Sequence, residues 1–279
     1  MKKILAVFDG LKFSAATASY AADIAKQSGA DLIGISLEDF MNRSFKFYDT
    51  VDEKGVSYAK MKQLIQKDKK TREMSVIKFG AYCDGEGINY SIHHDKNVAI
   101  QELLHESIYA DMIIINSSET LTYYPEDLPT RFIRDLLIDV ECPVLLVPHE
   151  YKPIKKISLL YDGEPSSVYA IKMLSYILEP FRKLPVEVIT VKNPKHILNV
   201  PDNKLMKEFM KRHFSETVYT ILEGLPEEEI ITHLKNDKQK SLVVLGAYRR
   251  SRVSRWFRES MADVLMKQLK LPLFIAHNK

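Results

Sequence analysis

The sequence has few of the features that mark disulfide-rich, metal-binding or membrane proteins. Its two cysteines, Cys83 and Cys142, lie far apart without a CxxC motif or Cys/His ligand spacing, which argues against a disulfide scaffold and a zinc site. No apolar run approaches the ~20 residues that a membrane helix needs. The chain begins Met-Lys-Lys-Ile-Leu-Ala-Val-Phe-Asp, which brings a charge into the apolar run too early for a signal peptide. We therefore expect a cytoplasmic protein and no membrane partner.

Catalytic signatures are also missing. The sequence has no Ser-His-Asp order, no nucleophile elbow and no Walker loop, so we assign no catalytic residue and expect no enzyme activity. Slow nucleotide hydrolysis is the enzymatic alternative, and no identifiable base supports it. The net charge of +3 is too small to indicate nucleic acid by itself. His93 and His94 are adjacent, so on a strand they point to opposite faces, and we expect no metal site.

An internal repeat divides the 279 residues, a length that suits two ordinary domains. The segment Lys2–Gly10 reappears as Lys155–Gly163, and Cys142–His149 reappears as Leu271–His277. The first match opens each half and the second closes it. The repeat therefore predicts two similar units in tandem.

These matches place domain 1 at residues 1–150 and domain 2 at residues 151–279, joined by the short polar connection Glu150–Pro153. Domain 1 contains one insertion, at about residues 40–87. We expect the insertion to hold a lysine-rich helix around Ser57–Thr71 and to end in a loop punctuated by glycines.

Strands and helices alternate in both halves, which predicts right-handed crossovers and a mostly parallel sheet with helices on both faces. Ser14 is placed to cap the first helix and Gly29 to end it. The expected strands are Ile4–Phe8, Leu32–Leu37, Ile88–Ile92, Met112–Ile115, Val144–Val147, Ile157–Tyr161, Val186–Val191, Val218–Leu222, Leu242–Leu245 and Leu273–Ala276.

The most informative stretch is Ser241–His277. A buried strand ends at Gly246, and an arginine-rich loop, a helix and a last strand behind Pro272 follow it. A strand, a glycine turn and a helix are the parts of a phosphate site, because backbone N–H groups and the positive end of the helix face the turn.

This stretch resembles the signature of the universal stress protein family, which has Gly, two residues, Gly, nine residues, then Gly and Ser or Thr. Gly246 takes the first glycine and Ser260 the closing hydroxyl, but Arg249 and Glu259 replace the other two glycines. An Asp after each first strand, the Glu-Gly-x-Pro turn at Glu223–Pro226 and the strands behind Pro143 and Pro272 extend the resemblance over nearly the whole chain, as two tandem copies.

The resemblance implies two Rossmann-like α/β units of the adenine-nucleotide-binding type, each with a five-stranded sheet. It also implies that the first-strand Asp faces adenine and that the glycine loop wraps the phosphates. The nucleotide-binding candidates are Asp162, Gly246, Arg249 and Ser260, with ATP as the only cofactor in view. Three of them have a simpler interpretation: Asp162 shapes a turn with Gly163, Arg249 belongs to a solvated basic loop, and Ser260 caps a helix.

The first half departs further from the signature. Asn116 stands where the glycine loop begins, and Ser117–Thr120 contains no glycine, so this copy is expected to be degenerate. The main interpretation is a stress-response binding or regulatory module with weak or degenerate nucleotide binding. The alternatives are an ATP-binding protein with one competent site in domain 2, and a binder of nucleic acid or another anion through the basic loop at residues 248–258.

The closing strands, Val144–Val147 and Leu273–Ala276, are apolar and end their units. An unpaired apolar edge invites a partner strand. Single-unit members of the family meet this need by dimerising, so the two closing strands are expected to pair within one molecule. A homodimer of the whole chain is the alternative that this prediction leaves open.

Overall fold

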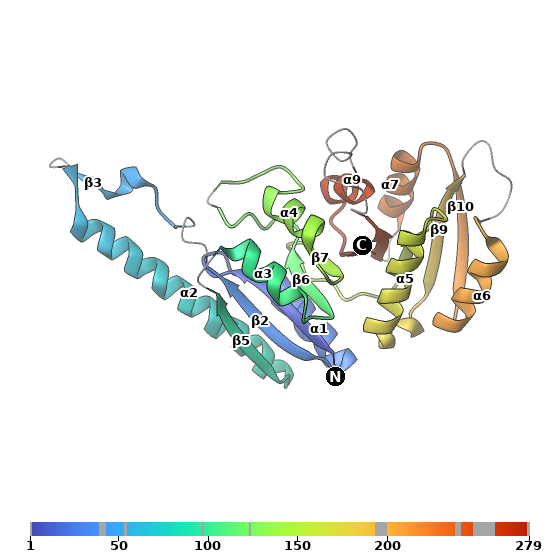
Figure 1. Ribbon diagram of the computed structural model, residues 1–279, viewed down its shortest axis with the longest axis horizontal. Helices are drawn as coiled ribbons and strands as arrows, with labels where there is room; N and C mark the ends of the chain where they lie inside the picture. Colours follow the sequence, from blue (N-terminus) through green and yellow to red (C-terminus); the bar gives the residue numbers. More distant parts are fainter. Residues whose placement is uncertain are drawn as a thin grey trace.

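The computed structural model describes residues 2–38, 43–52, 55–95, 98–122, 124–192, 200–237, 241–247 and 260–277. These residues form one continuous ten-stranded sheet with helices on both faces, and a separate two-stranded sheet (Figure 1).

The ten strands of the large sheet run in the order β10-β9-β8-β11-β12-β7-β6-β1-β2-β5, and every neighbouring pair is parallel except β12 and β7. Each half supplies five strands, with its first strand in the middle. This confirms the predicted α/β fold of two mostly parallel five-stranded units. The strands are β1 (Lys3–Asp9), β2 (Asp31–Leu37), β5 (Tyr90–Asp95), β6 (Met112–Asn116), β7 (Val144–Val147), β8 (Ile157–Leu160), β9 (Val186–Lys192), β10 (Thr217–Glu223), β11 (Leu242–Gly246) and β12 (Leu273–Ala276).

Two hydrophobic cores lie on opposite faces of this sheet. Along β1, Ile4, Ala6 and Phe8 belong to one core and Leu5 and Val7 to the other, because successive strand side chains point to opposite faces. The first core packs against α1 (Ala15–Ser28), α2 (Tyr58–Glu86), α5 (Pro165–Ile177), η2 (Glu179–Lys183) and α6 (Asn203–His213). The second packs against α3 (Ala99–Ser107), α4 (Arg131–Asp139), α7 (Pro226–Asn236) and α9 (Met261–Gln268).

The first helix has the predicted limits. The Ser14 hydroxyl accepts a hydrogen bond from the Thr17 N–H at 3.2 Å, and Gly29 ends α1 in the left-handed region with φ 61°. A cap of this kind stabilises a helix by about 1 kcal/mol.

The closing strands join the two halves, as the sequence predicted. β7 and β12 pair antiparallel, with Leu145 opposite Phe274 and Leu146 opposite Leu273. All four side chains are buried, and both cores continue across the junction. The two units therefore share one sheet and its cores.

Helix α2 differs from the prediction, because it continues from Tyr58 to Glu86 through the region expected to be a glycine-punctuated loop. A Cβ on Gly80 would lie 2.5 Å from the Tyr90 hydroxyl, and a Cβ on Gly34 would lie 2.6 Å from the Phe79 ring. Both glycines let the C-terminal half of α2 lie close to the sheet. The glycine that ends the helix is Gly87, with φ 66°.

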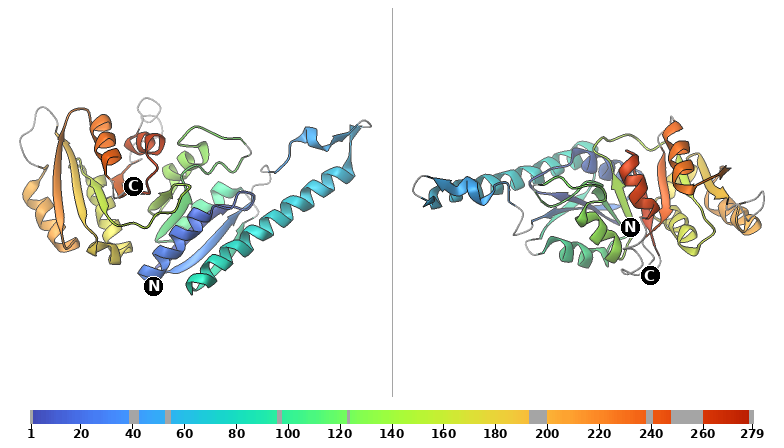
Figure 2. Two further views of the ribbon diagram at one scale, coloured as in Figure 1. Left: turned by 180° about the vertical axis from the view of Figure 1, so that it is seen from behind. Right: turned by 90° about the horizontal axis from the view of Figure 1, so that it is seen from above.

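The N-terminal part of α2 extends beyond the rest of the molecule, together with η1 (Phe47–Thr50) and the hairpin of β3 (Val51–Asp52) and β4 (Gly55–Val56) (Figures 1 and 2). α2 is long but rich in lysine. In the described part of the chain, no helix combines the length and hydropathy needed to cross a membrane.

Candidate functional site

A cavity of about 780 Å³ lies at the carboxyl ends of β8 and β11. The helix after β8, α5, packs on one face of the sheet, whereas α7, which leads into β11, packs on the other. The chain connections therefore reverse direction between these two neighbouring strands. Ligands of open parallel sheets bind at such a switch point.

The cavity walls are mostly apolar, with a few polar groups, as is typical of a small-molecule site. Three helices begin at the cavity, because Ser167 of α5, Pro226 of α7 and Met261 of α9 belong to its lining. Helix N-termini carry partial positive charge and favour anions. The other lining residues are Leu160, Tyr161, Asp162, Ile189, Thr190, Val191, Lys192, Val200, Pro201, Ile230, Leu245 and Gly246.

Asp162 is exposed at the cavity and shapes its turn. Its Oδ1 accepts a hydrogen bond from the Glu164 N–H at 3.0 Å, and Gly163 has φ 86°. One carboxylate oxygen of Asp162 therefore shapes the turn with Gly163, as the simpler interpretation expected. A carboxylate offers about four acceptor positions, so this bond is compatible with contact to a ligand.

Gly246 lies in the same cavity, at the end of β11, and its lack of a side chain has a packing reason. A Cβ there would lie 2.4 Å from the carbonyl carbon and oxygen of Ser166, in the first turn of α5. Any other residue would push β11 and α5 apart. The glycine is therefore required by the helix that borders the cavity.

Ser260 caps α9, as the simpler interpretation of this residue expected. Its hydroxyl accepts from the Asp263 N–H at 3.2 Å, and the Ser260 N–H donates to Asp263 Oδ2 at 3.1 Å. Ser260 is next to Met261 of the cavity lining. Arg249, Glu259 and the rest of the predicted basic loop lie outside the described residues, so the structure does not bear on their part in binding.

The corresponding position in the first half holds a pocket of only about 280 Å³. There Asn116 folds back on its own loop: its Oδ1 accepts from the Ser118 N–H at 2.9 Å and from the Ser118 hydroxyl at 2.6 Å. Ser118 is also 2.9 Å from His149 Nε2. Because the Ser118 hydroxyl donates to Asn116, it accepts from His149, and this pair is not arranged as a nucleophile and its base.

An acidic side chain, Glu119, lines this first-half pocket, and the buried Asp9 carboxylate is near enough to act on its charge. Glu119 is buried, and that burial together with the negative charge of Asp9 raises its pKa, despite hydrogen bonds from the Leu121 and Thr120 N–H groups. Lys12 is held at the pocket by the Thr120 hydroxyl at 3.1 Å and by the Thr122 carbonyl. The first-half pocket is thus small, and two charged side chains, Lys12 and Glu119, are in its lining.

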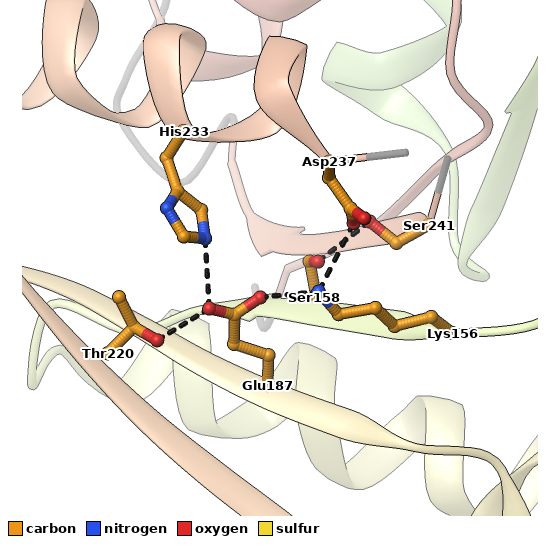
Figure 3. Close-up of polar contacts among 7 residues, drawn as sticks. All are labelled: Lys156, Ser158, Glu187, Thr220, His233, Asp237 and Ser241. Carbon is orange, nitrogen blue, oxygen red and sulfur yellow. Dashed lines mark hydrogen bonds and ion pairs between the residues drawn. The ribbon is translucent and has the colours of Figure 1, made fainter. Parts of the chain in front are cut away.

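A second polar cluster lies at the opposite, amino-terminal ends of β8 and β9 (Figure 3). Lys156 Nζ is 2.8 Å from Glu187 Oε2 and 3.2 Å from Asp237 Oδ2, and His233 Nε2 is 2.9 Å from Glu187 Oε1. The Thr220 hydroxyl donates to the same Glu187 oxygen. This cluster connects α7 to three strands and lies away from the cavity, so we assign it a structural role.

The first half has a related cluster of Lys3, Glu106 and His93. Glu106 is 2.9 Å from Lys3 Nζ and 2.7 Å from His93 Nδ1. Here the carboxylate is on the helix and the imidazole on the strand, the reverse of Glu187 and His233. His93 was expected after the third strand but lies within β5, opposite Ile35. The sequence repeat shows Lys3 and Lys156 at equivalent positions. The equivalence of the two clusters is not visible in the sequence, because the carboxylate and the imidazole exchange places between strand and helix.

Comparisons with known proteins show similarity in structure alone. No protein-family model matches the sequence, and no curated protein does either. A universal stress protein from Archaeoglobus fulgidus DSM 4304 has a TM-score of 0.71 at 13% identity, over 99% of this chain and 98% of its own. A functionally unknown protein and a putative universal stress protein, both from Pseudomonas aeruginosa, have TM-scores of 0.57 and 0.55 at 15% and 17% identity, each over 99% of this chain and 92% of its own. The chain therefore has, along nearly its whole length, the fold of universal stress proteins.

Proposed function

We propose that this chain is a binding or regulatory module, not an enzyme, that holds one adenine nucleotide weakly in the cavity of its second half. The observation that carries the proposal is a cavity of about 780 Å³ at a switch point of the sheet, with Asp162 and Gly246 in its lining. A role in stress response and a cytoplasmic location belong to the same proposal, and the fold shared with universal stress proteins supports the former.

The chemistry of the lining suits the parts of a nucleotide. The apolar walls, such as Ile189, Val191 and Leu245, suit a flat base, and the Asp162 carboxylate is an acceptor for an exocyclic amino group. The three helix N-termini favour the phosphates. Lys192 adds a positive charge, and its partner Glu223 is largely exposed, so a phosphate can compete for the lysine.

The first half fits this role poorly. Its pocket of about 280 Å³ is below the ~300–1,000 Å³ usual for ligand sites. Its lining includes the side chain of Glu119, and a carboxyl group there disfavours a bound phosphate. One nucleotide per chain is therefore proposed.

We expect Asp162→Ala to weaken ATP binding by about tenfold or more, because a hydrogen bond to a charged group contributes roughly 1.5–3 kcal/mol. Isothermal titration with ATP and Mg²⁺ measures the change. The matched control is Asp9→Ala, the same substitution at the repeat position, which should leave the affinity unchanged once circular dichroism shows that the variant is folded. A large loss for Asp9→Ala, or none for Asp162→Ala, would place the site elsewhere.

Weak binding is expected from Arg249 and Glu259 at two glycine positions of the signature. Replacing both with glycine should strengthen ATP binding several-fold in the same titration, because it frees backbone N–H groups and removes a carboxylate that repels phosphate. Lys152→Gly with Glu150→Gly, an exposed ion pair in the connection between the halves, is a control with the same change of charge and should leave the affinity unchanged. If the first variant binds no better than the parent chain, the alignment to the signature is wrong.

A further inference from the structure

A groove of about 580 Å³ runs along α2 and shares Phe13 with the lining of the first-half pocket. One wall is a single stripe of α2, because the contributing residues recur at spacings of three and four from Gln63 to Lys78. At 1.5 Å per residue this stripe is about 23 Å long. The loop after β1 contributes Leu11 and Phe13 to the groove. Its shape is therefore that of a trough along a straight helix.

The charge of the groove has one sign. Lys67, Lys70 and Lys78 line it and are exposed, and no carboxylate is among its lining residues. Within the described part of the chain, none of these three lysines makes an ion pair. Three such ammonium groups along one stripe attract an acidic partner.

The groove also has an apolar strip. Met74 is half exposed between Lys70 and Lys78, and Leu11 and Phe13 are half buried beside it. The Phe13 ring is fixed by edge contact with Phe8, at 5.7 Å between ring centroids. Adaptable methionine next to a rigid ring is a surface on which apolar side chains of a partner can pack.

We propose that this groove binds an acidic amphipathic helix of a partner protein. A helix laid along α2 would place its apolar residues against Met74 and Phe13 and its carboxylates against the lysines, which is the helix-in-groove mode of recognition. Nucleic acid matches less well. Phe13 is the sole aromatic ring among the lining residues, so the groove lacks the successive stacking platforms that single-stranded nucleic acid uses.

The test uses the full chain and a fluorescein-labelled helical peptide of about 18 residues, with leucines at helical spacing and glutamates flanking them. Fluorescence anisotropy should show binding, and the variant with Lys67, Lys70 and Lys78 all changed to Glu should bind at least tenfold more weakly. The matched control changes Lys60, Lys62 and Lys69 to Glu. These are exposed lysines of the same helix outside the groove lining, and this variant should lose less than threefold.

Met74→Ala should weaken binding of the peptide several-fold. Diffuse attraction between the lysines and the peptide charges does not depend on Met74, so it would leave the affinity of this variant unchanged. The proposal is overturned if the parent chain does not bind the peptide, or if both triple variants lose affinity equally. It is also overturned if the groove lysines are needed for a single-stranded oligonucleotide or for phosphatidylserine vesicles but not for the peptide. Circular dichroism of each variant verifies that α2 is intact.

Discussion

Phe274→Asp is expected to unfold both halves of the chain together. Phe274 is fully buried on β12, opposite Leu145 of β7, at the junction in the middle of the ten-stranded sheet. Loss of a buried phenylalanine costs about 3–5 kcal/mol, and an unpaired buried carboxylate costs several kcal/mol more. Because a domain is stable by only about 5–15 kcal/mol, this change should remove most of its stability.

Urea unfolding followed by circular dichroism, together with limited proteolysis, measures this effect. Cleavage should appear in both halves at once. Val218→Asp is the matched control, since it places the same charge on the edge strand β10 where the side chain is 64% exposed, and it should change stability by only about 0.5 kcal/mol. Phe274→Asp chains in which either half stays resistant to protease would show that the halves are independent.

Glu187→Gln is expected to lower stability at neutral pH and much less in acid. Burial by itself raises the pKa of the Glu187 carboxyl, but hydrogen bonds from Lys156 and Thr220 and the charges of Lys156 and His233 outweigh it, so the pKa lies below its ordinary value of 4.5. A carboxyl with a lowered pKa stabilises the folded state above the pKa of the unfolded chain. That contribution is lost as pH falls through the lowered pKa.

At pH 7 the free energy of unfolding should fall by about 2–3 kcal/mol in the variant. This is below the 3–5 kcal/mol usual for a broken buried ion pair, because Asp237 still faces Lys156. At pH 3 the parent and the variant should differ less, because the stabilisation that the charged Glu187 provides decreases once the pH is below the ordinary carboxyl pKa of 4.5. Urea unfolding at the two pH values gives both differences. Glu208→Gln, at an exposed pair with Arg212 on α6, should have little effect at either pH. A loss for Glu187→Gln that is the same at pH 3 and pH 7 would contradict this account.

The fold could be predicted because its signals are local and occur twice. Apolar strands such as Ile4–Phe8 and Leu242–Leu245, with Pro143 and Pro272 before the closing strands, indicated two parallel units, and the apolar closing strands indicated their pairing. The same approach misjudged the end of α2. The glycines at the end of the insertion were taken as a sign of a loop, but Gly80 lies within α2, where a Cβ would be 2.5 Å from the Tyr90 hydroxyl of β5.

The candidate site was predictable only in part, for the same reason. The resemblance to the universal stress protein signature indicated Asp162 and Gly246 as candidates, and they share a cavity. The role of Gly246 depends on Ser166, and the small size of the first-half pocket depends on contacts of Asn116 and Lys12 across the chain. Such long-range contacts leave no local pattern in a single sequence.

A crystal structure of the full chain grown with ATP and Mg²⁺ tests the central claim most directly. The account predicts electron density for one nucleotide per chain, in the cavity at the ends of β8 and β11, with the base beside Asp162 and no nucleotide in the first-half pocket. Density in the first-half pocket, or a second-half cavity that stays empty at saturating ATP, would contradict it.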